Sequence, residues 1–327
     1  MTLKAQAFWV AAPGQGEIRA ESIASRSHAD EVLVRTLYSG ISRGTESLVF
    51  QGRVPESEFR RMRCPFQQGD FPAPVKYGYA SVGTIEQGPD HLRGRNIFCL
   101  HPHQDLYRVP VAAVHPLPDD VPAQRAVLAA NMETALNGIW DSRIGPGDRV
   151  GIIGAGVVGA LCAWLAGRIP GVDVTLVDIN PDRGELAEAL GVNFAVPGQA
   201  PGDQDVLIHS SGSGDGLNRA LELAGEEARV VEMSWYGDDQ PRVALGQAFH
   251  SRRLTLRSSQ VGQLPDDRRA RWSRERRMQK ALQLLNNPDL DVLISGESDF
   301  TELPEVMPGL ALASGQALCH RINYNAP

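Results

Sequence analysis

The segment RVGIIGAGVVGALCAWLAGRI, residues 149–169, determines how this chain folds. Its first half is a short apolar run typical of a buried strand, and its second half has apolar residues at helical spacing. Between the two halves, Gly154, Gly156 and Gly159 form a G-x-G-x-x-G pattern. In this context the pattern predicts a strand, a tight turn and a helix whose N-terminus binds a pyrophosphate.

Each part of this segment has an expected role in binding a dinucleotide. The first glycine allows the turn, the second lets the backbone approach the phosphates, and the third lets the helix pack on the strand. Val157 and Val158 open the helix, where backbone N–H groups point at the ligand. Asp178 ends the next expected strand, where a carboxylate accepts hydrogen bonds from the adenosine ribose. This favours NAD over NADP, although Arg183 leaves NADP open as the alternative.

The chain changes character at about residue 120. Before this point, short β-type segments separated by Gly, Pro and Asp predict an irregular β-rich unit. After it, strands and helices alternate, and we expect strands at 149–156, 173–180, 193–196, 205–212, 228–235 and 254–260. Six strands joined by crossover helices predict a doubly wound parallel sheet, and hence an α/β protein. We expect two domains, residues 1–119 with 263–327 and residues 120–262, because the tail is too short to fold alone.

Composition excludes several classes of protein. The 327 residues are 42% hydrophobic and 22% charged, which is typical of one large or two medium folded domains. A net charge of −7 offers no field for nucleic acid or anionic lipid. The four cysteines lack C-x-x-C spacing, so a disulfide framework is not indicated. With no leader pattern and no apolar run of about 18 residues, we expect a cytoplasmic protein with no membrane partner.

The order of these elements, together with SGISRGTE at residues 39–46, makes the whole chain similar to the medium-chain dehydrogenase/reductase superfamily. The motif at residues 39–46 resembles that of uncharacterised zinc-binding dehydrogenases. More distantly, it resembles that of the dehydrogenase that oxidises the hydroxyethyl group of a bacteriochlorophyll precursor. The resemblance implies a GroES-like catalytic domain, a Rossmann cofactor domain and hydride transfer at the nicotinamide in the cleft between them. It also implies a homodimer formed by sheet extension.

The positions that hold zinc in metal-dependent members carry other residues here. By this resemblance the ligands are a cysteine after G-I, the histidine of G-H-E, and a cysteine or acid just before the cofactor domain. In this chain Ser42 follows G-I, the second position reads Gly78-Tyr79-Ala80, and the third falls near residues 130–133. Zinc sites require thiolate and imidazole donors, and the four-cysteine structural lobe is also missing. We therefore expect no zinc.

One metal alternative rests on spacing. Cys99, His101 and His103 alternate along an expected strand and share one face if that strand is regular. Pro102 interrupts the run and no fourth ligand is evident, which favours an edge segment instead. His209 and His320 lie inside strand-like segments and are interpreted as packing residues.

Without zinc, hydrogen-bond donors must stabilise the oxygen that gains charge during hydride transfer. Tyr79 stands in the place of the histidine ligand and is the first choice as donor or general acid, with Ser42 across from it. To act as a base, a phenol needs a cationic neighbour, and Lys76 is close in sequence. Glu46 and Glu133 are further acid/base candidates. The alternative for Tyr79 is a packing aromatic that fills the vacated metal pocket.

Other residues are assigned to the cofactor. In relatives, an arginine at the position of Arg43 contacts the pyrophosphate, and a threonine matching Thr134 lies beside the nicotinamide. Ser210 and Ser211 end the fourth expected strand, and Ser234 ends the fifth. Ligands of open α/β sheets bind beyond the carboxyl ends of the strands, so all three serines belong near the dinucleotide.

The sequence thus predicts a zinc-independent oxidoreductase that uses NAD(H) or NADP(H) on an alcohol/ketone pair. A quinone or enone reductase is the first alternative, and a nucleotide-binding protein without catalysis is the second. The arginine run of residues 268–277 is interpreted as a solvated helix face, because no aromatic platform accompanies it. Residues 50–75 carry Arg60, Arg61 and Arg63, which either bind an acidic substrate or decorate the surface.

Overall fold

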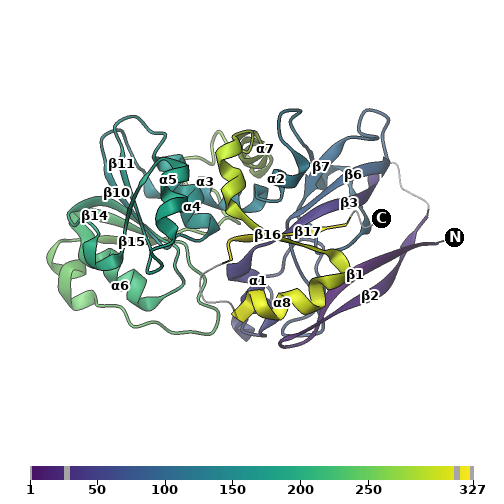
Figure 1. Cartoon of the computed structure of the whole chain (residues 1–327), viewed down its shortest axis with the longest axis horizontal. Coiled ribbons are helices and arrows are strands. Elements are labelled where there is room, and N and C mark those ends of the chain that lie inside the picture. The colour runs from purple at the N-terminus through teal and green to yellow at the C-terminus, as the bar shows by residue number, and fades with distance from the viewer. Residues whose placement is uncertain (1, 26–29, 313–316, 325–327) are drawn as a thin grey trace. The chain divides into compact units, whose positions relative to one another are not determined.

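A computed structural model describes residues 2–25, 30–312 and 317–324 (Figure 1). The chain forms two compact units: unit 1 is Met1–Ala130 with Leu282–Pro327, and unit 2 is Asn131–Ala281. One unit is strand-rich and the other is built on a parallel six-stranded sheet, which confirms the expected fold class. None of the helices formed by the described residues is long and apolar enough to span a lipid bilayer.

Unit 2 is a doubly wound sheet in the strand order β12-β11-β10-β13-β14-β15, and all its pairs are parallel. All six expected strands are present: β10 (Arg149–Ile153), β11 (Asp173–Val177), β12 (Asn193–Ala195), β13 (Gln204–His209), β14 (Ala224–Glu232) and β15 (Thr255–Ser258). Several end before their expected limits, because the residues beyond them form the turns at the carboxyl edge. Ile152, Leu176 and Leu207 at the sheet centre have no exposed surface, and each such side chain contributes about 1.5–3 kcal/mol.

The helices and short turns of unit 2 connect these strands. They are α3 (Ala129–Ser142), α4 (Val157–Ala166), α5 (Arg183–Leu190), η3 (Pro197–Gln199), α6 (Gly214–Leu223), η4 (Leu245–Phe249) and α7 (Arg274–Leu284). Helix α4 is apolar nearly throughout and is buried from Gly159 to Ala163, as a helix between sheet and neighbours must be.

The expected domain limits at 119/120 and 262/263 fall earlier in the chain than the observed limits. The side chain of Arg277 accounts for the second difference. It is 2% exposed, and it donates to Glu133 Oε1 at 3.0 Å and to Asn137 Oδ1 at 2.5 Å, both on α3. This contact fastens the first turns of α7 to α3, so the helix begins in unit 2.

Unit 1 contains two sheets, one in the order β2-β1-β5-β4 and one in the order β16-β17-β3-β6-β7-β9, with β8 paired to β3. Their bounds are β1 (Thr2–Ala12), β2 (Gln15–Ala24), β3 (Glu31–Ile41), β4 (Gln68–Gly69), β5 (Val75–Lys76), β6 (Ser81–Gln87), β7 (Asn96–Cys99), β8 (Leu106–Pro110), β9 (Val114–Pro116), β16 (Ile294–Asp299) and β17 (Cys319–Asn323). Strand β17 pairs with β3 antiparallel, so the tail returns to the N-terminal unit as expected.

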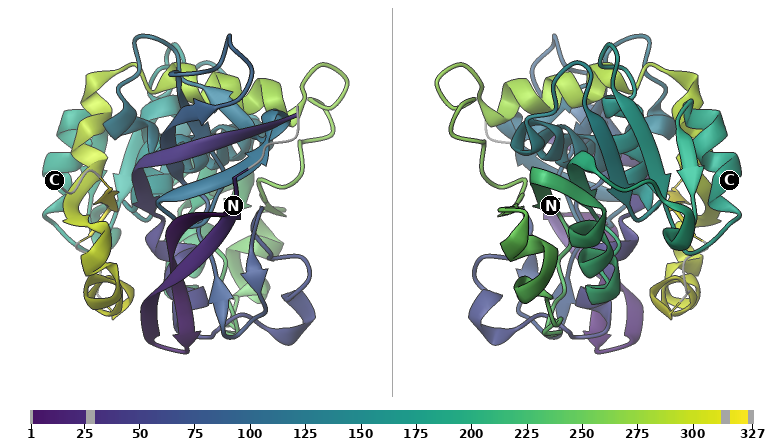
Figure 2. Two further views of the ribbon diagram at one scale, coloured as in Figure 1. Left: turned by 90° about the vertical axis from the view of Figure 1, so that its right-hand side faces the viewer. Right: turned by 90° about the vertical axis from the view of Figure 1, so that its left-hand side faces the viewer.

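Short helices complete unit 1. They are α1 (Arg43–Phe50), η1 (Glu56–Glu58), η2 (Val111–Ala113), α2 (Ala123–Ala126), η5 (Pro288–Leu293), η6 (Phe300–Glu302) and α8 (Leu303–Leu312). Strand β2 was not expected from the sequence. It forms a long hairpin with β1, drawn in purple in Figure 2. None of its residues is fully buried, so it lacks the apolar run that marks a strand.

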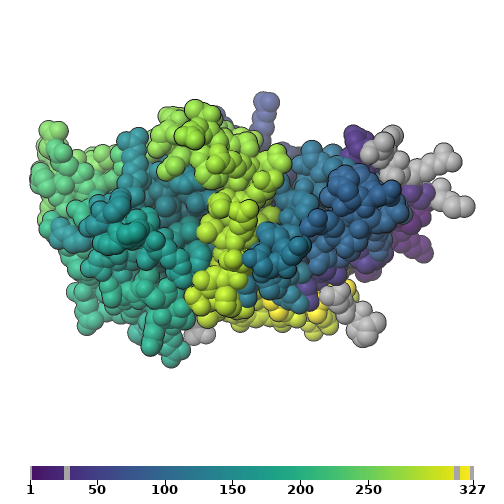
Figure 3. All heavy atoms as spheres, turned by 90° about the horizontal axis from the view of Figure 1, so that it is seen from above, coloured from purple at the N-terminus to yellow at the C-terminus, as the bar shows by residue number. Residues whose placement is uncertain are grey.

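The arginine run is a solvated segment except at Arg268 and Arg277. Arg269, Arg271 and Arg274 are exposed, and the light-green chain before α7 lies on the surface in Figure 3. Arg277 turns inward to Glu133, and Arg268 is partly buried over the ring of Trp140.

Candidate functional site

The glycine turn of unit 2 has the geometry that the sequence predicts. Gly154 has a φ of +104°, and a Cβ there would lie 2.7 Å from the backbone nitrogen of Ser211. A Cβ on Gly159 would lie 1.9 Å from the carbonyl oxygen of Gly154, so helix and strand meet here without room for a side chain. Gly156 caps α4 and faces open space. The turn is therefore closed toward the protein and open where a ligand would approach.

Asp178 follows β11 and is tied to this turn. Its Oδ2 accepts the backbone N–H of Ala155 at 2.7 Å, and its Oδ1 accepts that of Asn180 at 2.9 Å. Each oxygen keeps a lone pair for a ribose hydroxyl. Ile179, which the sequence analysis did not single out, is 86% exposed, and Arg183 starts α5. An exposed isoleucine after the strand is an apolar surface on which an adenine ring can pack.

The three candidate serines of unit 2 lie at the carboxyl ends of their strands. Ser210 donates its hydroxyl to the carbonyl oxygen of Gly154 at 3.1 Å, which fixes the turn. Ser211 is exposed, and Ser234 Oγ accepts the backbone N–H of Gly212 at 3.1 Å. Ser210 and Ser211 therefore adjoin the glycine turn, whereas Ser234 contacts the loop that follows Ser211.

Behind these serines lies a buried hydrogen-bond network that the sequence did not reveal. His209 has no exposed surface, in keeping with a packing role, yet both of its ring nitrogens are engaged. Nδ1 lies 2.7 Å from Glu232 Oε2, and Nε2 lies 2.6 Å from Ser211 Oγ. Glu232 also accepts the hydroxyl of Tyr236 at 3.0 Å and the backbone N–H of Ser234 at 2.7 Å. His209 thus connects the partly buried carboxylate of Glu232 to the hydroxyl of Ser211.

Glu133 and Thr134 lie on α3. The Glu133 carboxylate is 6% exposed and paired with Arg277. Burial raises the pKa of Glu133, while the adjacent guanidinium lowers it. The geometry of Glu133 is that of a structural ion pair.

In unit 1 the candidate residues gather around the start of α1. Glu46 is 4% exposed; its Oε1 accepts the backbone N–H of Ser42 at 2.7 Å, and its Oε2 lies 2.8 Å from His103 Nε2. The other nitrogen of His103, Nδ1, lies 2.7 Å from Ser39 Oγ, which is 3.0 Å from the hydroxyl of Tyr324. A chain of hydrogen bonds thus connects Glu46 to Tyr324 through His103 and Ser39. The sequence analysis singled out Glu46 but missed Ser39 and Tyr324.

Tyr79 belongs to the same cluster, and its hydroxyl hydrogen-bonds with Ser42 and Thr45. Burial and then the charge of Glu46 raise the pKa of this phenol above its ordinary value. Tyr79 is therefore a neutral hydrogen-bond donor.

The expectation that Lys76 would help Tyr79 act as a base is wrong. The Lys76 ammonium lies 2.8 Å from Glu21 Oε2 and 2.7 Å from Gln104 Oε1, so its charge is already paired with a carboxylate. A buried ammonium needs such a carboxylate, and Glu21 on β2 supplies it.

The alternative metal group on Cys99, His101 and His103 is not assembled. The ring of His101 stacks on Tyr107 at 3.8 Å, and burial lowers its pKa to about 3. Both ring nitrogens of His103 already hydrogen-bond, one with Glu46 and the other with Ser39. Within residues 2–25, 30–312 and 317–324, no three His, Cys, Asp or Glu side chains are grouped so as to hold a metal ion.

Cys64 lies near this cluster. Its thiol is buried, which raises its pKa to about 12, and the charge of Glu46 adds to that shift. At neutral pH the thiol is protonated and is a poor metal ligand.

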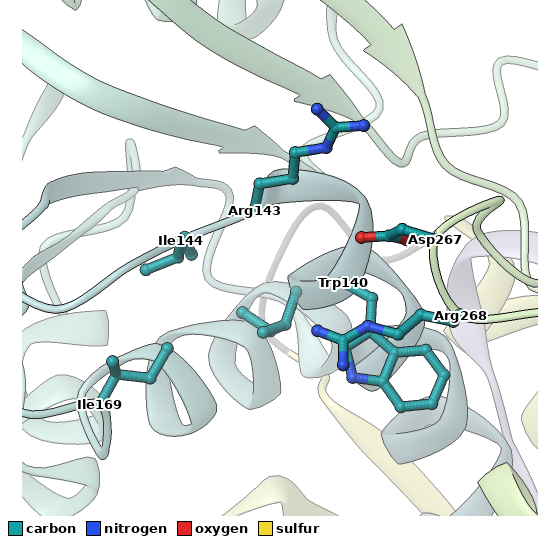
Figure 4. A pocket seen from close by; sticks show the side chains of 7 residues that line it. Trp140, Arg143, Ile144, Ile169, Asp267 and Arg268 are labelled. Carbon is teal, nitrogen blue, oxygen red and sulfur yellow. The ribbon is translucent and has the colours of Figure 1, made fainter. Parts of the chain in front are cut away.

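A cavity of about 690 Å³ lies elsewhere in unit 2 (Figure 4). It is lined by Ile139, Trp140, Arg143, Ile144, Ile169, Asp267 and Arg268. Five of these residues end or follow α3 and α4, and Asp267 and Arg268 lie in the segment before α7, whereas the glycine turn lies at the start of α4. The cavity is therefore separate from the glycine turn.

Comparison with known proteins gives a relative that covers most of the chain. D-guloside 3-dehydrogenase of Escherichia coli K12 is 23% identical over 308 residues, which cover 85% of this chain and 88% of that protein. No family model matches the chain.

Two solved structures have the same fold. L-Idonate 5-dehydrogenase of E. coli K-12 superposes with a TM-score of 0.82 at 16% identity, over 99% of each chain. A zinc-binding dehydrogenase of Sinorhizobium meliloti, so described provisionally and bound to NADP, superposes with a TM-score of 0.79 at 18% identity, over 98% of this chain and 100% of that one.

Proposed function

The chain belongs to the medium-chain dehydrogenase/reductase superfamily, and from this premise we propose a zinc-independent oxidoreductase that transfers hydride between NAD(H) and an alcohol/ketone pair. The Escherichia coli relative is named as a 3-dehydrogenase of a D-guloside, which is a sugar derivative. We propose a polyhydroxylated secondary alcohol, or the matching ketone, as the substrate class.

The closed glycine turn carries the proposal. Gly159 brings α4 against the carbonyl of Gly154, and Gly156 leaves the ligand side open. Residues 154–159 would hold the pyrophosphate, and Asp178 with Ile179 would hold the adenosine. When bound, the nicotinamide supplies or accepts the hydride. A carboxylate at residue 178 supports NAD, since a 2′-phosphate there meets like charge. The Sinorhizobium structure holds NADP, so both dinucleotides enter the test.

We propose that unit 1 stabilises the substrate oxygen. As a carbonyl receives hydride, its oxygen gains negative charge, which a preorganised donor stabilises. Tyr79 is such a donor, because burial and Glu46 keep its proton on the phenol until a strongly basic oxygen forms. Ser42 and Thr45 hold the phenol in place, and His103 orients Glu46 through the 2.8 Å contact. Tyr79 is the proposed catalytic residue, and Glu46 and His103 are positioning residues.

Zinc does not fit the residues that stand at the family's ligand positions. A hydroxyl at residue 42 and a phenol at residue 79 are poor zinc donors, and they already bond to each other. Glu133, near the third position, is neutralised by Arg277. This donor chemistry supports a reaction that depends on hydrogen bonds.

We also propose a homodimer formed through β15. This strand lies at the end of its sheet, pairs with β14 among the described strands, and exposes all four of its residues. An exposed edge strand is a ready template for pairing with another copy.

Calorimetric titration with NAD⁺ and NADP⁺, followed by turnover on sugar alcohols, ketones, quinones and enones, tests the function. Oxidation of polyols with NAD⁺ supports it. Turnover of quinones or enones alone indicates the reductase alternative, and binding without turnover indicates the non-catalytic one. A protein that binds neither dinucleotide contradicts the proposal. Metal analysis of the active protein tests zinc independence, which one tightly bound zinc per chain would overturn.

A further inference from the structure

The cavity in Figure 4 is lined by side chains of two kinds. Ile139, Ile144 and Ile169 form an apolar wall, and Arg143 and Arg268 contribute guanidinium groups. Its volume of about 690 Å³ is in the range of pockets that hold small organic ligands. We propose that this cavity binds a small organic carboxylate with an apolar body. The site is separate from the glycine turn, so the inference goes beyond the proposed function and does not depend on it.

Arg143 follows the end of α3 and lies near two further arginines. Arg229 on β14 and Arg257 on β15 lie on the same face of the sheet, because Arg229 pairs with Thr255, two residues before Arg257. The end of α3 lies against this face, since Asp141 Oδ1 accepts a hydrogen bond from Arg257 Nε at 3.1 Å. Burial and then the charges of Arg143 and Arg257 lower the pKa of Arg229, in keeping with three neighbouring guanidinium groups. Three cations thus gather beside the cavity.

In the described part of the chain, one of these three guanidinium groups is paired with a carboxylate. Asp141 pairs with Arg257, whereas Arg143 and Arg229 form no ion pair with residues 2–25, 30–312 or 317–324. Arg229 is half-buried, so water and salt screen its repulsion from the neighbouring cations less than at the surface. A bound anion would offset this repulsion and stabilise the folded unit. The cluster therefore favours an anionic group beside Arg143.

The charged wall of the cavity also has an excess of positive charge. Figure 4 shows Asp267 and Arg268 on the right and Ile144 and Ile169 on the left, so the charged and apolar walls are separate. The Arg268 guanidinium lies 5.4 Å from the centroid of the Trp140 ring, and its Nε is buried without a hydrogen-bond partner in the described chain. Asp267 is the one carboxylate among the lining residues, against two guanidinium groups. One negative charge on a ligand balances this set.

A ligand needs both an anionic group and an apolar body to match this lining. An inorganic anion would leave the isoleucines exposed to water, and an uncharged apolar molecule would leave the arginines without a counterion. A carboxylate accepts two parallel hydrogen bonds from a planar guanidinium, which is the geometry that arginine favours. The apolar body of the ligand would then lie on the isoleucine wall.

Isothermal titration calorimetry of the whole chain at neutral pH tests the site with octanoate as the probe. We expect a Kd of about 1 mM or lower. Acetate, which lacks the chain, and 1-octanol, which lacks the charge, should each bind at least about tenfold more weakly. Arg143→Gln should raise the Kd of octanoate about tenfold, and Ile169→Ala should raise it about fivefold. Arg242→Gln removes an exposed arginine of the same unit that does not line the cavity, and it should bind octanoate like the wild type.

The controls distinguish this site from non-specific binding. The proposal is overturned if octanoate does not bind, if acetate or 1-octanol binds as tightly, or if octanoate keeps its affinity in either cavity variant. An equal loss of affinity in Arg242→Gln also overturns it, because the loss would then follow the net charge of the unit. Should Ile169→Ala not fold, the variant of the exposed Arg143 decides. Binding of NAD⁺ is measured in the same preparation, and its failure would affect the proposed function alone.

Discussion

Substitutions at Gly156 and Gly159 test two roles of the glycine turn separately. One role is in folding, and the other is the proposed binding of a dinucleotide. In Gly159→Ala the new Cβ would lie 1.9 Å from the carbonyl oxygen of Gly154 and 2.6 Å from Ser210 Oγ. Backbone atoms cannot yield as a flexible side chain does, so helix and strand must move apart. In Gly156→Ala the Cβ meets nothing within 4 Å, and alanine adopts the φ of −73° without strain.

The two variants therefore have different expected outcomes. Overpacking of this kind costs about 1–3 kcal/mol, which lowers the melting temperature of a domain of this size by about 4–8 °C for a cost near 2 kcal/mol. Gly159→Ala should show this loss and bind NAD⁺ poorly. Gly156→Ala should melt like the wild type and still lose at least about tenfold in affinity, because its methyl group occupies the side from which the phosphates approach.

Differential scanning calorimetry and isothermal titration measure these two quantities. Gly198→Ala is the matched control, since a Cβ there also meets nothing within 4 Å and the residue lies in η3, away from the turn. The reasoning is refuted if Gly156→Ala binds NAD⁺ like the wild type, or if Gly159→Ala is as stable as the control.

Three further predictions concern other parts of the chain. Tyr79→Phe should lower kcat by about 10²–10³ without changing the affinity for NAD⁺, and unchanged turnover would make Tyr79 a packing residue. Burial lowers the pKa of His101 from 6.5 to about 3, so the unfolded chain takes up a proton at this residue more readily than the folded protein. The free energy of unfolding is therefore unaffected by His101 above about pH 6.5 and decreases as the pH falls toward 3. His101→Gln should therefore unfold at a lower pH in an acid titration followed by circular dichroism, and an unchanged midpoint contradicts this. Leu256→Lys on the edge strand β15 should convert a dimer to a monomer in light scattering, whereas a wild-type protein that is already monomeric removes the proposed interface.

Local patterns in the sequence were sufficient to predict the sheet of unit 2 and its glycine turn. The apolar run of β10, the glycines and the helix of α4 lie within one continuous segment, so their spacing alone specifies how they meet. Asp178 was predicted near the turn because consecutive parallel strands place their carboxyl ends at one edge, and it bonds to Ala155 there.

The site in unit 1 was predicted only in part, because it depends on pairings between distant strands. Glu46, Ser42 and Tyr79 were found through their positions in family motifs. His103 and Ser39 are 64 positions apart, and Ser39 and Tyr324 are 285 apart, so no local pattern relates them. Lys76 was misjudged for the same reason: its partner Glu21 lies on β2, a strand too exposed to be recognised from its sequence.

The return of β17 to β3 has a consequence for how the protein is made. Unit 2 is one uninterrupted stretch of chain and can fold while translation continues, but unit 1 is completed by residues that leave the ribosome last. Until then β3 lacks its β17 neighbour, and Ser39 has no Tyr324 to bond. Nascent unit 1 therefore exposes an unpaired β edge during synthesis, and this is the stage at which a chaperone would most affect the yield of active protein.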